Sequence, residues 1–350
     1  MRVAYVMEAP DAIGGAERAV QFLVRGVAAQ GAEVRVVVVG ESDAQGLERL
    51  LLDFSEVACV QRARIRNLPL VLRKLSADVV HWNFPHPFAF RSGLPVLAGG
   101  SAPHVVTDHL PQLRAGSRSE LTRRGINRKL AAVITVGSSA HADAVAHWPG
   151  LQKLHVIRNG VPLAKTTQQR SWSDGQPLRL CFVGRLEAQK NPDQALRIAA
   201  GLIRGGVATE LTIVGTGSLE ADLRVRARQL AIDDHVAFTG WLEDVSHVLD
   251  SVHLVLAPGR WEGLPFLPME ALVRGVPVVA SDIPPHRELS SASEGLIIVK
   301  GDTDVAWREA TLSAALNLAK HSEAGLRSRP ALSSEQMIRQ TVSLYQSVIG

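Results

Sequence analysis

Two carboxylates flank the expected start of a helix in the stretch WEGLPFLPMEA, residues 261–271. Glu262 falls in an expected loop. Glu270 follows after seven further residues, inside a helix that can begin at 265–268, because proline is tolerated in a first helical turn. The Glu270 carboxylate can accept hydrogen bonds from a diol such as a ribose, and that of Glu262 from the hydroxyls of a sugar. Alternatively, Glu270 complements the helix dipole, which leaves Glu262 unexplained.

Backbone N–H groups and two cations near these glutamates suit an anion. The N–H groups at the start of the helix, within 264–266, are expected to face an anion. Upstream, in CFVGRLEAQKNPDQAL, Gly184 ends an apolar run and is followed by Arg185 and Lys190. Because arginine offers a planar fork and lysine a point charge, the two together suit a diphosphate. The alternative is two solvated cations at a helix entrance.

Two further glycine-containing turns follow apolar runs. Gly14 and Gly15, in APDAIGGAERAV, open an expected helix whose N–H groups and dipole suit a phosphate. A plain strand-to-helix turn is the alternative. Gly215, in LTIVGTGSLEADL, indicates close approach of the backbone to a ligand in the same cleft. Neither stretch has the glycine spacing of a dinucleotide-binding turn.

The elements that must position these residues alternate along the whole chain. Apolar runs predict strands at 2–7, 34–39, 57–60, 79–82, 104–107, 133–136, 178–183, 210–214, 235–238, 254–257, 276–280 and 296–299. Helical patterns cover 16–30, 68–75 and 120–130, among others, and a last helix at 334–349. The fold class is therefore α/β, with two doubly wound Rossmann-like sheets facing each other across a cleft. The expected domains are 1–163 and 177–350, joined by a linker at 164–176, and the last helix is a candidate to pack back on the N-terminal domain.

The composition is that of an ordinary globular protein. Of its 350 residues, 46% are hydrophobic and 21% charged, and the net charge is +4, which favours anionic partners such as nucleotides or a membrane surface. The first apolar run ends at Pro10 and is typical of a core strand, not a signal peptide. Cys59 and Cys181 lie in apolar runs and are expected to be buried thiols. We therefore expect a cytoplasmic protein.

The succession of motifs resembles the family-4 retaining glycosyltransferases (glycosyl transferases group 1) of the GT-B fold, which use a nucleotide-sugar donor. The matching stretches are GGAE, VTDH, RNGV, VGRLEAQKN, IVGTGSLEADL, FTGW and WEGLPFLPMEALVRGVPVVASD, in the family's order and spacing from about residue 3 to residue 300. One departure is Leu-Pro-Phe, at 264–266, where many members have Phe-Gly-Leu.

The resemblance implies a role for each matching residue. Glu270 would hold the ribose and Glu262 the donor sugar, while Arg185 and Lys190 would neutralise the diphosphate leaving group. Further donor-site residues are Gly14, Gly15, Gly184, Gly215, Gly263, Leu264 and Pro265, with Trp241 and Leu242 bordering the nucleobase. His109, in VVTDHLP, falls where the family places a histidine that faces the sugar and the acceptor. With Arg185, Lys190 and Glu262 it completes the catalytic set.

The loop HWNFPHPFAF, residues 81–90, is the candidate acceptor pocket because it carries rigid, flat side chains. Its candidates are His81, Trp82, Asn83 and His86. A metal site at His81 and His86 is the alternative, but it has no third ligand nearby. The basic segment 62–75 resembles an amphipathic membrane-surface helix, and an ordinary helix that precedes the next strand is the alternative. The basic segment 114–129 could attract an anionic acceptor or lipid headgroups, and a solvated helix face is the alternative.

The leading function is transfer of a sugar from a UDP- or GDP-sugar to an acceptor hydroxyl with retention of anomeric configuration. No cofactor, metal or nucleic-acid partner is expected. The Asp-x-Asp of GDTDV, residues 301–305, is interpreted as a helix start with aspartate as N-cap. The acceptor classes left open are a glycan, a lipid-linked sugar and a small molecule, and peripheral contact with the inner membrane face is a further hypothesis. A sugar-nucleotide epimerase of the same fold and a non-catalytic nucleotide-sugar-binding subunit are the alternatives.

Overall fold

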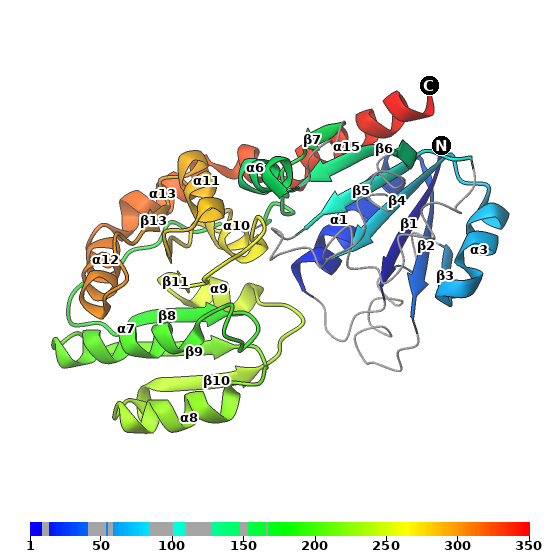
Figure 1. Cartoon of the computed structure of the whole chain (residues 1–350). Helices are drawn as coiled ribbons and strands as arrows, with labels where there is room; N and C mark the ends of the chain where they lie inside the picture. The colour runs from blue at the N-terminus through cyan, green and yellow to red at the C-terminus, as the bar shows by residue number, and fades with distance from the viewer. Residues whose placement is uncertain are drawn as a thin grey trace. The chain divides into compact units, whose positions relative to one another are not determined.

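The computed structural model of this chain describes residues 1–8, 14–40, 54, 59–84, 101–109, 128–147, 153–165 and 167–350. The chain divides into two compact units (Figure 1). The first unit consists of Met1–Gly160 and the C-terminal segment Ser334–Gly350, and the second unit is Val161–Ser333. The segment expected as a linker thus belongs to the second unit, and the last helix belongs to the first.

The first unit is built on a parallel sheet that is seven-stranded in the described residues. Its strands, in the spatial order β3-β2-β1-β4-β5-β6-β7, are β1 (Arg2–Glu8), β2 (Glu33–Val39), β3 (Cys59–Ala63), β4 (Val79–Phe84), β5 (His104–Asp108), β6 (Leu130–Thr135) and β7 (Leu154–Val156). Its described helices are α1 (Gly15–Ala29), the 3-10 turn η1 (Ile65–Asn67), α3 (Leu68–Leu75), α6 (Ser138–His147) and α15 (Ser334–Ile349). Separate apolar clusters cover the two faces of the sheet, as a fully parallel sheet requires.

The second unit repeats this plan with a six-stranded parallel sheet. In the order β10-β9-β8-β11-β12-β13, its strands are β8 (Leu178–Val183), β9 (Thr209–Val214), β10 (Val236–Gly240), β11 (Leu254–Ala257), β12 (Val278–Ala280) and β13 (Leu296–Ile298). Its helices are α7 (Pro192–Arg204), α8 (Glu220–Gln229), η2 (Asp233–His235), α9 (Ser246–Ser251), α10 (Phe266–Leu272), α11 (Pro284–Ala292), α12 (Asp304–Leu316), α13 (Leu318–Arg327) and α14 (Arg329–Leu332).

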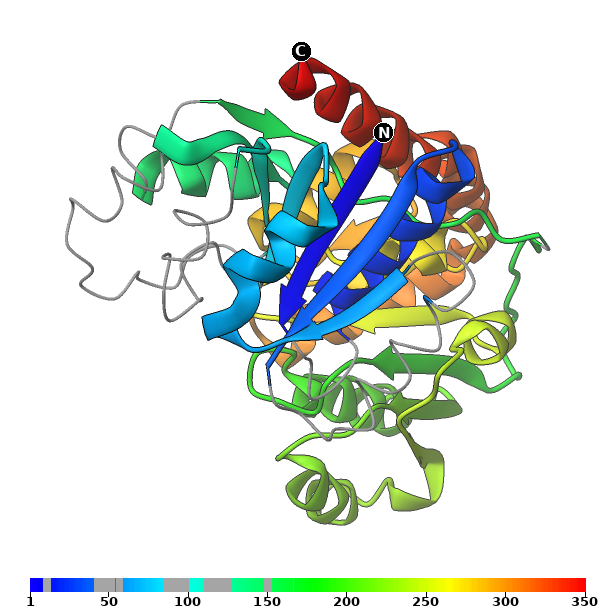
Figure 2. The same cartoon turned by 90° about the vertical axis from the view of Figure 1, so that its right-hand side faces the viewer.

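The C-terminal helix α15 completes the core of the first unit. Both views show it beside the N-terminal elements (Figures 1 and 2), and its residues Met337, Leu344 and Tyr345 are buried in the cluster that contains β1 and α1. Tyr345 donates a hydrogen bond from its hydroxyl to that of Tyr5 over 2.9 Å. The chain thus returns to its starting domain over the last 17 residues, 334–350.

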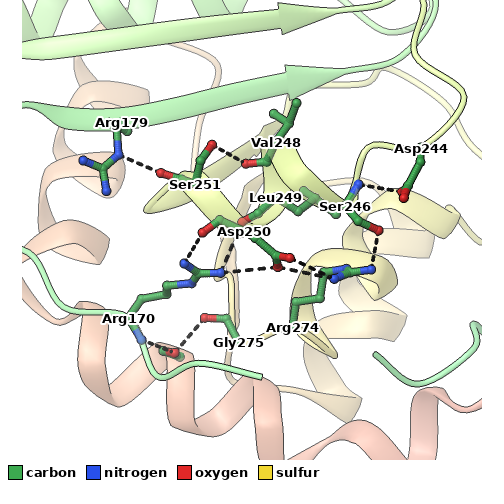
Figure 3. A network of polar contacts seen from close by, with 11 residues as sticks. Arg170, Arg179, Asp244, Ser246, Val248, Leu249, Asp250, Ser251, Arg274 and Gly275 are labelled. Carbon is green, nitrogen blue, oxygen red and sulfur yellow. Dashed lines mark hydrogen bonds and ion pairs between the residues drawn. The ribbon is translucent and has the colours of Figure 1, made fainter. Parts of the chain in front are cut away.

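The segment that precedes β8 is tied to the second unit through Arg170, which is only 8% exposed. The Arg170 guanidinium donates to the carbonyl oxygens of Asp250 and Leu249 at the end of α9, over 2.5 and 3.4 Å (Figure 3). The Arg170 N–H donates to Ser322, 2.8 Å away. Carbonyl groups at a helix C-terminus lack helical partners and attract cations, so these contacts fix the segment to α9.

Several expected elements differ in detail from the observed ones. Leu130 is the first residue of β6, not the end of a helix, because it is buried in the sheet core. The remainder of the expected helix at 120–130 lies almost wholly outside the described residues. The short strand β7 was not expected, since its three residues include only one β-branched side chain. Cys59 is exposed, contrary to expectation, because β3 is the edge strand, whereas Cys181 is buried. Among the described helices, none is both long and apolar enough to cross a membrane.

Candidate functional site

Three loops meet at the carboxyl edge of the second sheet. They follow β8, β9 and β11, which are neighbours in the sheet. The strand order reverses between β8 and β11, and such a switch point is where doubly wound sheets bind ligands. The first two loops touch through glycine: a Cβ on Gly215, whose φ is +132°, would lie 1.9 Å from the Gly184 carbonyl oxygen. Only glycine allows this approach.

The third loop, which follows β11, places Glu262 beside Lys190. The Lys190 Nζ lies 2.5 Å from a carboxylate oxygen of Glu262, and Glu262 is 8% exposed. Gly259 leaves room for this carboxylate, since a Cβ there would lie 2.9 Å from the Glu262 Oε1. A buried carboxylate is stable only with a charged or hydrogen-bonding partner. The two oppositely charged residues that the sequence singled out therefore form one pair.

The remaining predicted residues of the second unit lie on the same edge. Arg185 is exposed and donates to Gln189 over 2.7 Å. Gly263, Leu264 and Pro265 are buried, and Pro265 is the N-cap of α10. Glu270 is half-buried on the second turn of α10, and Trp241 and Leu242, also half-buried, follow β10.

A buried histidine is connected through Ser281 to residues 258–265, the loop that carries Glu262 and is called the glutamate loop below. His286 Nδ1 lies 2.9 Å from the Ser281 carbonyl oxygen, and the Ser281 hydroxyl donates to the Gly259 carbonyl over 2.5 Å. Burial lowers the pKa of His286, and the Ser281 carbonyl and Glu262 oppose that shift. His286, Ser281 and Gln189 are not among the predicted site residues. The one available signal was their position: Gln189 and Ser281 lie inside two of the matching stretches, and His286 lies four residues after the second of these.

In the first unit, His109 and Asn83 lie together at the ends of β5 and β4. His109 Nε2 is 3.3 Å from the Asn83 side-chain oxygen, and the Asn83 amide donates to the His81 carbonyl over 3.3 Å. Burial lowers the pKa of His109 to about 4, so its imidazole is neutral near pH 7. A neutral imidazole can both donate and accept a hydrogen bond.

One of the two N-terminal glycines does not offer its N–H group to a phosphate as expected. Gly14 is the N-cap of α1, and its N–H donates to the Glu17 carboxylate over 2.8 Å. Gly15 is the first residue of the helix and is exposed. Glu17 thus occupies the Gly14 N–H, as in a capping box.

Two of the acceptor candidates are core residues, which corrects the expectation. His81 is fully buried, with its ring nitrogens bonded to the hydroxyls of Tyr345 and Thr107. Trp82 is 1% exposed and donates to His104 over 3.0 Å. Successive strand residues point to opposite faces, and because helices cover both faces here, neither side chain can line a pocket. Of the other candidates, Asn83 is buried beside His109, and His86 lies outside the described residues.

The Asp-x-Asp segment is a helix start, but the N-cap is Thr303, whose hydroxyl accepts from the Ala306 N–H. Asp304 follows it and pairs with Arg197 over 2.9 Å. The aspartate expected as N-cap therefore complements the helix and a neighbouring cation. Across the described ranges, no three His, Cys, Asp or Glu side chains are grouped as ligands of a metal.

Two family models match successive parts of the chain: "Glycosyltransferase Family 4" over residues 13–165 and "Glycosyl transferases group 1" over residues 164–323. The chain belongs to glycosyltransferase family 4. Solved structures agree on the fold of this family-4 member. An Anabaena protein, HepE, crystallised with UDP, has a TM-score of 0.77 at 14% identity, covering 99% of this chain and 100% of that one. TarM of S. aureus has a TM-score of 0.79 at 12% identity, with coverages of 99% and 100%. The fold is GT-B.

Curated relatives match this family-4 member over shorter stretches. The amylovoran biosynthesis glycosyltransferase AmsK of Erwinia amylovora is 32% identical over 37% of this chain and 34% of its own length. A GDP-mannose-dependent phosphatidylinositol dimannoside mannosyltransferase of Mycobacterium tuberculosis is 33% identical over 36% and 33%, respectively. The chain thus spans about one third of the length of these two relatives.

Proposed function

We propose that this family-4 member transfers a sugar from a nucleoside-diphosphate donor, a UDP- or GDP-sugar, to an acceptor hydroxyl. The observation that carries the proposal is the grouping of four charged residues at one sheet edge: Arg185, Lys190 and Glu262 lie on adjacent loops, and Glu270 lies on α10, the helix that follows the Glu262 loop. This grouping combines fixed cations for a diphosphate with carboxylates for sugar hydroxyls. The relatives that were crystallised with UDP or named as GDP-mannose-dependent support a donor of this class.

The proposed chemistry follows from the charges. As the anomeric C–O bond opens, negative charge builds on the leaving phosphate, and fixed cations lower the barrier most when they face that charge. Arg185 and Lys190 take this role. Glu262 holds the donor sugar, and Glu270 accepts hydrogen bonds from the ribose. His109, neutral because it is buried, is suited to a hydrogen bond with a sugar hydroxyl.

Retention of configuration and independence of metal belong to the same proposal. Glu262 is paired with Lys190, so we assign no enzyme carboxylate as a nucleophile. The acceptor hydroxyl then attacks the anomeric carbon directly, from the same face that the phosphate leaves. The bond between the acceptor oxygen and the anomeric carbon forms as the bond between that carbon and the phosphate oxygen breaks. The proton of the acceptor hydroxyl passes to the leaving phosphate. Trapping a covalent glycosyl–enzyme adduct would contradict this mechanism.

The test is nucleotide release from a panel of UDP- and GDP-sugars, with and without candidate acceptors and with and without EDTA. A transferase releases nucleotide only slowly without acceptor and faster with it, and EDTA leaves the rate unchanged. Product NMR reports the anomeric configuration. Conversion of the donor sugar without acceptor would instead indicate an epimerase, and binding without any turnover a non-catalytic subunit.

We also propose peripheral contact of the first unit with an anionic membrane surface. Arg62, Arg66, Arg73 and Lys74 are exposed on β3, η1 and α3, and Leu70 between them is 57% exposed. Such a surface combines charge attraction with an apolar side chain. Sedimentation with phosphatidylglycerol vesicles but not phosphatidylcholine vesicles is expected, and equal binding to both would contradict the proposal. The second basic segment, 114–129, lies outside the described residues apart from its last two.

A further inference from the structure

The loop between β8 and α7, residues 184–191, carries both proposed diphosphate cations, but they are held in different ways. Lys190 is paired with the buried carboxylate of Glu262. Arg185 is exposed, and its guanidinium donates from Nη2 to the side-chain oxygen of Gln189 over 2.7 Å. A long exposed side chain occupies many rotamers unless a contact selects one. The position of Arg185 therefore depends on what holds Gln189.

Gln189 is fixed by the glutamate loop at two points. Its side-chain Nε2 donates to the Trp261 carbonyl oxygen over 2.9 Å, and its own carbonyl accepts from the Arg260 N–H over 2.8 Å. Both contacts are immediately before Glu262. Gln189 thus joins the loop that carries the cations to the loop that carries the buried carboxylate.

The opposite side of the cation loop is also anchored. The Glu187 carboxylate accepts from the Ser218 N–H and hydroxyl, each over 2.8 Å, and these hydrogen bonds lower the pKa of Glu187. The Leu186 N–H donates to the Thr216 carbonyl over 2.9 Å. Because these contacts hold the loop on both sides, what remains to be fixed is the direction of the exposed Arg185 side chain.

Only an amide side chain of this length satisfies both neighbours of Gln189. A guanidinium only donates hydrogen bonds and a backbone carbonyl only accepts them, so the residue between them must accept on one side and donate on the other. A glutamate would place an oxygen against the Trp261 carbonyl and would add a negative charge where a diphosphate is proposed to bind. An alanine would leave the Arg185 side chain unguided.

We infer that Gln189 is a positioning residue: it holds the Arg185 guanidinium toward the diphosphate of the donor. The inference rests on the proposed function, because it concerns the same diphosphate. Gln189 acts through Arg185, whereas Trp261 and Arg260 supply the fixed points on which Gln189 rests.

The test is a double-mutant cycle on diphosphate affinity, measured by titration calorimetry with UDP, GDP and inorganic pyrophosphate. Gln189→Ala is expected to weaken binding roughly 3- to 10-fold, the scale of ordering one long side chain on binding. Gln189→Glu should weaken it at least as much through charge repulsion. In an Arg185→Ala background, Gln189→Ala should cause no further loss, because the residue through which it acts is gone.

A second glutamine on the same unit provides a matched control. Gln194, on α7, also accepts from an arginine, Arg197, and donates to an oxygen, that of Asp304 over 3.1 Å. Gln194→Ala should lower the melting temperature without changing diphosphate affinity. If Gln189→Ala acted only by destabilising the fold, it would leave diphosphate affinity unchanged, as Gln194→Ala does.

The outcomes separate this inference from the proposed function. If the wild-type protein binds a diphosphate but the losses of Gln189→Ala and Arg185→Ala add in full, Gln189 does not act through Arg185 and the inference is wrong. Unchanged affinity in both Gln189 variants would overturn it as well. If the wild-type protein binds none of the three probes, the proposed function fails and this inference fails with it.

Discussion

At the scale of single residues, the Lys190–Glu262 pair has two separable effects. The contact is 2.5 Å and the carboxylate is buried, so removing one partner costs stability in addition to its effect on the proposed chemistry. Removing one partner leaves an uncompensated charge, whereas removing both charges does not. This asymmetry makes it possible to tell a structural from a catalytic contribution.

We predict that Lys190→Ala lowers kcat by about 10² or more, the scale of losing one preorganised charge at a developing anion, and also lowers the melting temperature. The double variant Lys190→Ala/Glu262→Gln should recover much of the stability but not the activity. Lys300→Ala removes an exposed cation next to β13 and is the matched control, with kcat unchanged. If the Lys190 variant shows only a higher KM, Lys190 contributes uniform binding instead of transition-state stabilisation.

The second unit's site was predictable from sequence to a greater degree than the first unit's. Arg185, Lys190 and Glu262 are charged residues in short loops after apolar runs, and the structure groups them at one sheet edge. His81 and Trp82 gave the wrong expectation because the aromatic content of a segment does not reveal that these two residues lie within a strand that is covered on both faces. Gln189 and His286 were not predicted, because hydrogen bonds to a neighbouring side chain or to backbone carbonyls have no signature in residue type or spacing.

At the scale of elements, strands were predictable wherever a run of β-branched residues was long. The core strands β1, β2, β8 and β9 match expectation to within one residue. Short or edge strands such as β3 and β7 were misplaced or missed, because their side chains are partly exposed and the apolar signal is weak. The contact of α15 with α1 is set by tertiary packing, and it depends on a glycine in the middle of a helix.

We predict that Gly26→Ala destabilises the first unit by about 1–3 kcal/mol through overpacking. A Cβ on Gly26 would lie 2.2 Å from the Ile338 Cδ1 and 2.6 Å from its Cγ1, so the Ile338 side chain or the helix that carries it must shift. Gly201→Ala in α7 is the matched control, since its Cβ would meet Arg308 at an ordinary 3.5 Å and alanine favours a helix by about 1 kcal/mol. Urea denaturation measures both.

Ile338→Ala tests the cause of that effect. If the clash with Ile338 is responsible, the double variant Gly26→Ala/Ile338→Ala should be less destabilised than the sum of its single changes, because the added methyl group occupies the space that the isoleucine leaves. Full additivity would mean that Gly26 is required for another reason.

At the scale of the whole molecule, the two units differ in the polar groups that they bury. Among its described residues, the first unit holds three buried histidines: burial lowers the pKa of His81 to about 3 and that of His104 and His109 to about 4. In the described part of the second unit there are two: burial lowers the pKa of His253 to about 4, with Arg179 and Arg170 adding to the shift, and burial also lowers the pKa of His286. Stability toward acid should therefore be limited first by the unit that contains His81, His104 and His109.

We predict that the free energy of unfolding falls as the pH is lowered from about 6.5 to about 4. An unfolded histidine takes up its proton near pH 6.5, while the folded form stays neutral down to the lowered pKa, so in this interval the unfolded state binds more protons. The slope is about 1.4 kcal/mol per pH unit for each such proton, and it flattens below pH 4 for His104 and His109. Carboxyl groups with a lowered pKa, such as Asp78, act below their ordinary value of 3.8 and do not contribute to this window.

Urea denaturation at pH 7.5, 6 and 5 measures this slope, and one variant assigns it. His104→Gln keeps an acceptor for the Trp82 N–H, which His104 Nδ1 accepts over 3.0 Å, but it cannot titrate. The slope should therefore fall by up to the contribution of one proton, about 1.4 kcal/mol per pH unit, while the free energy of unfolding at pH 7.5 changes little. A slope equal to that of the wild-type protein would mean that His104 is not neutral in the folded chain. Hydrogen exchange at pH 5 then locates the loss, which should appear in β1, β4 and β5 before it appears in β8 and β11, because the three histidines lie on or directly after β4 and β5.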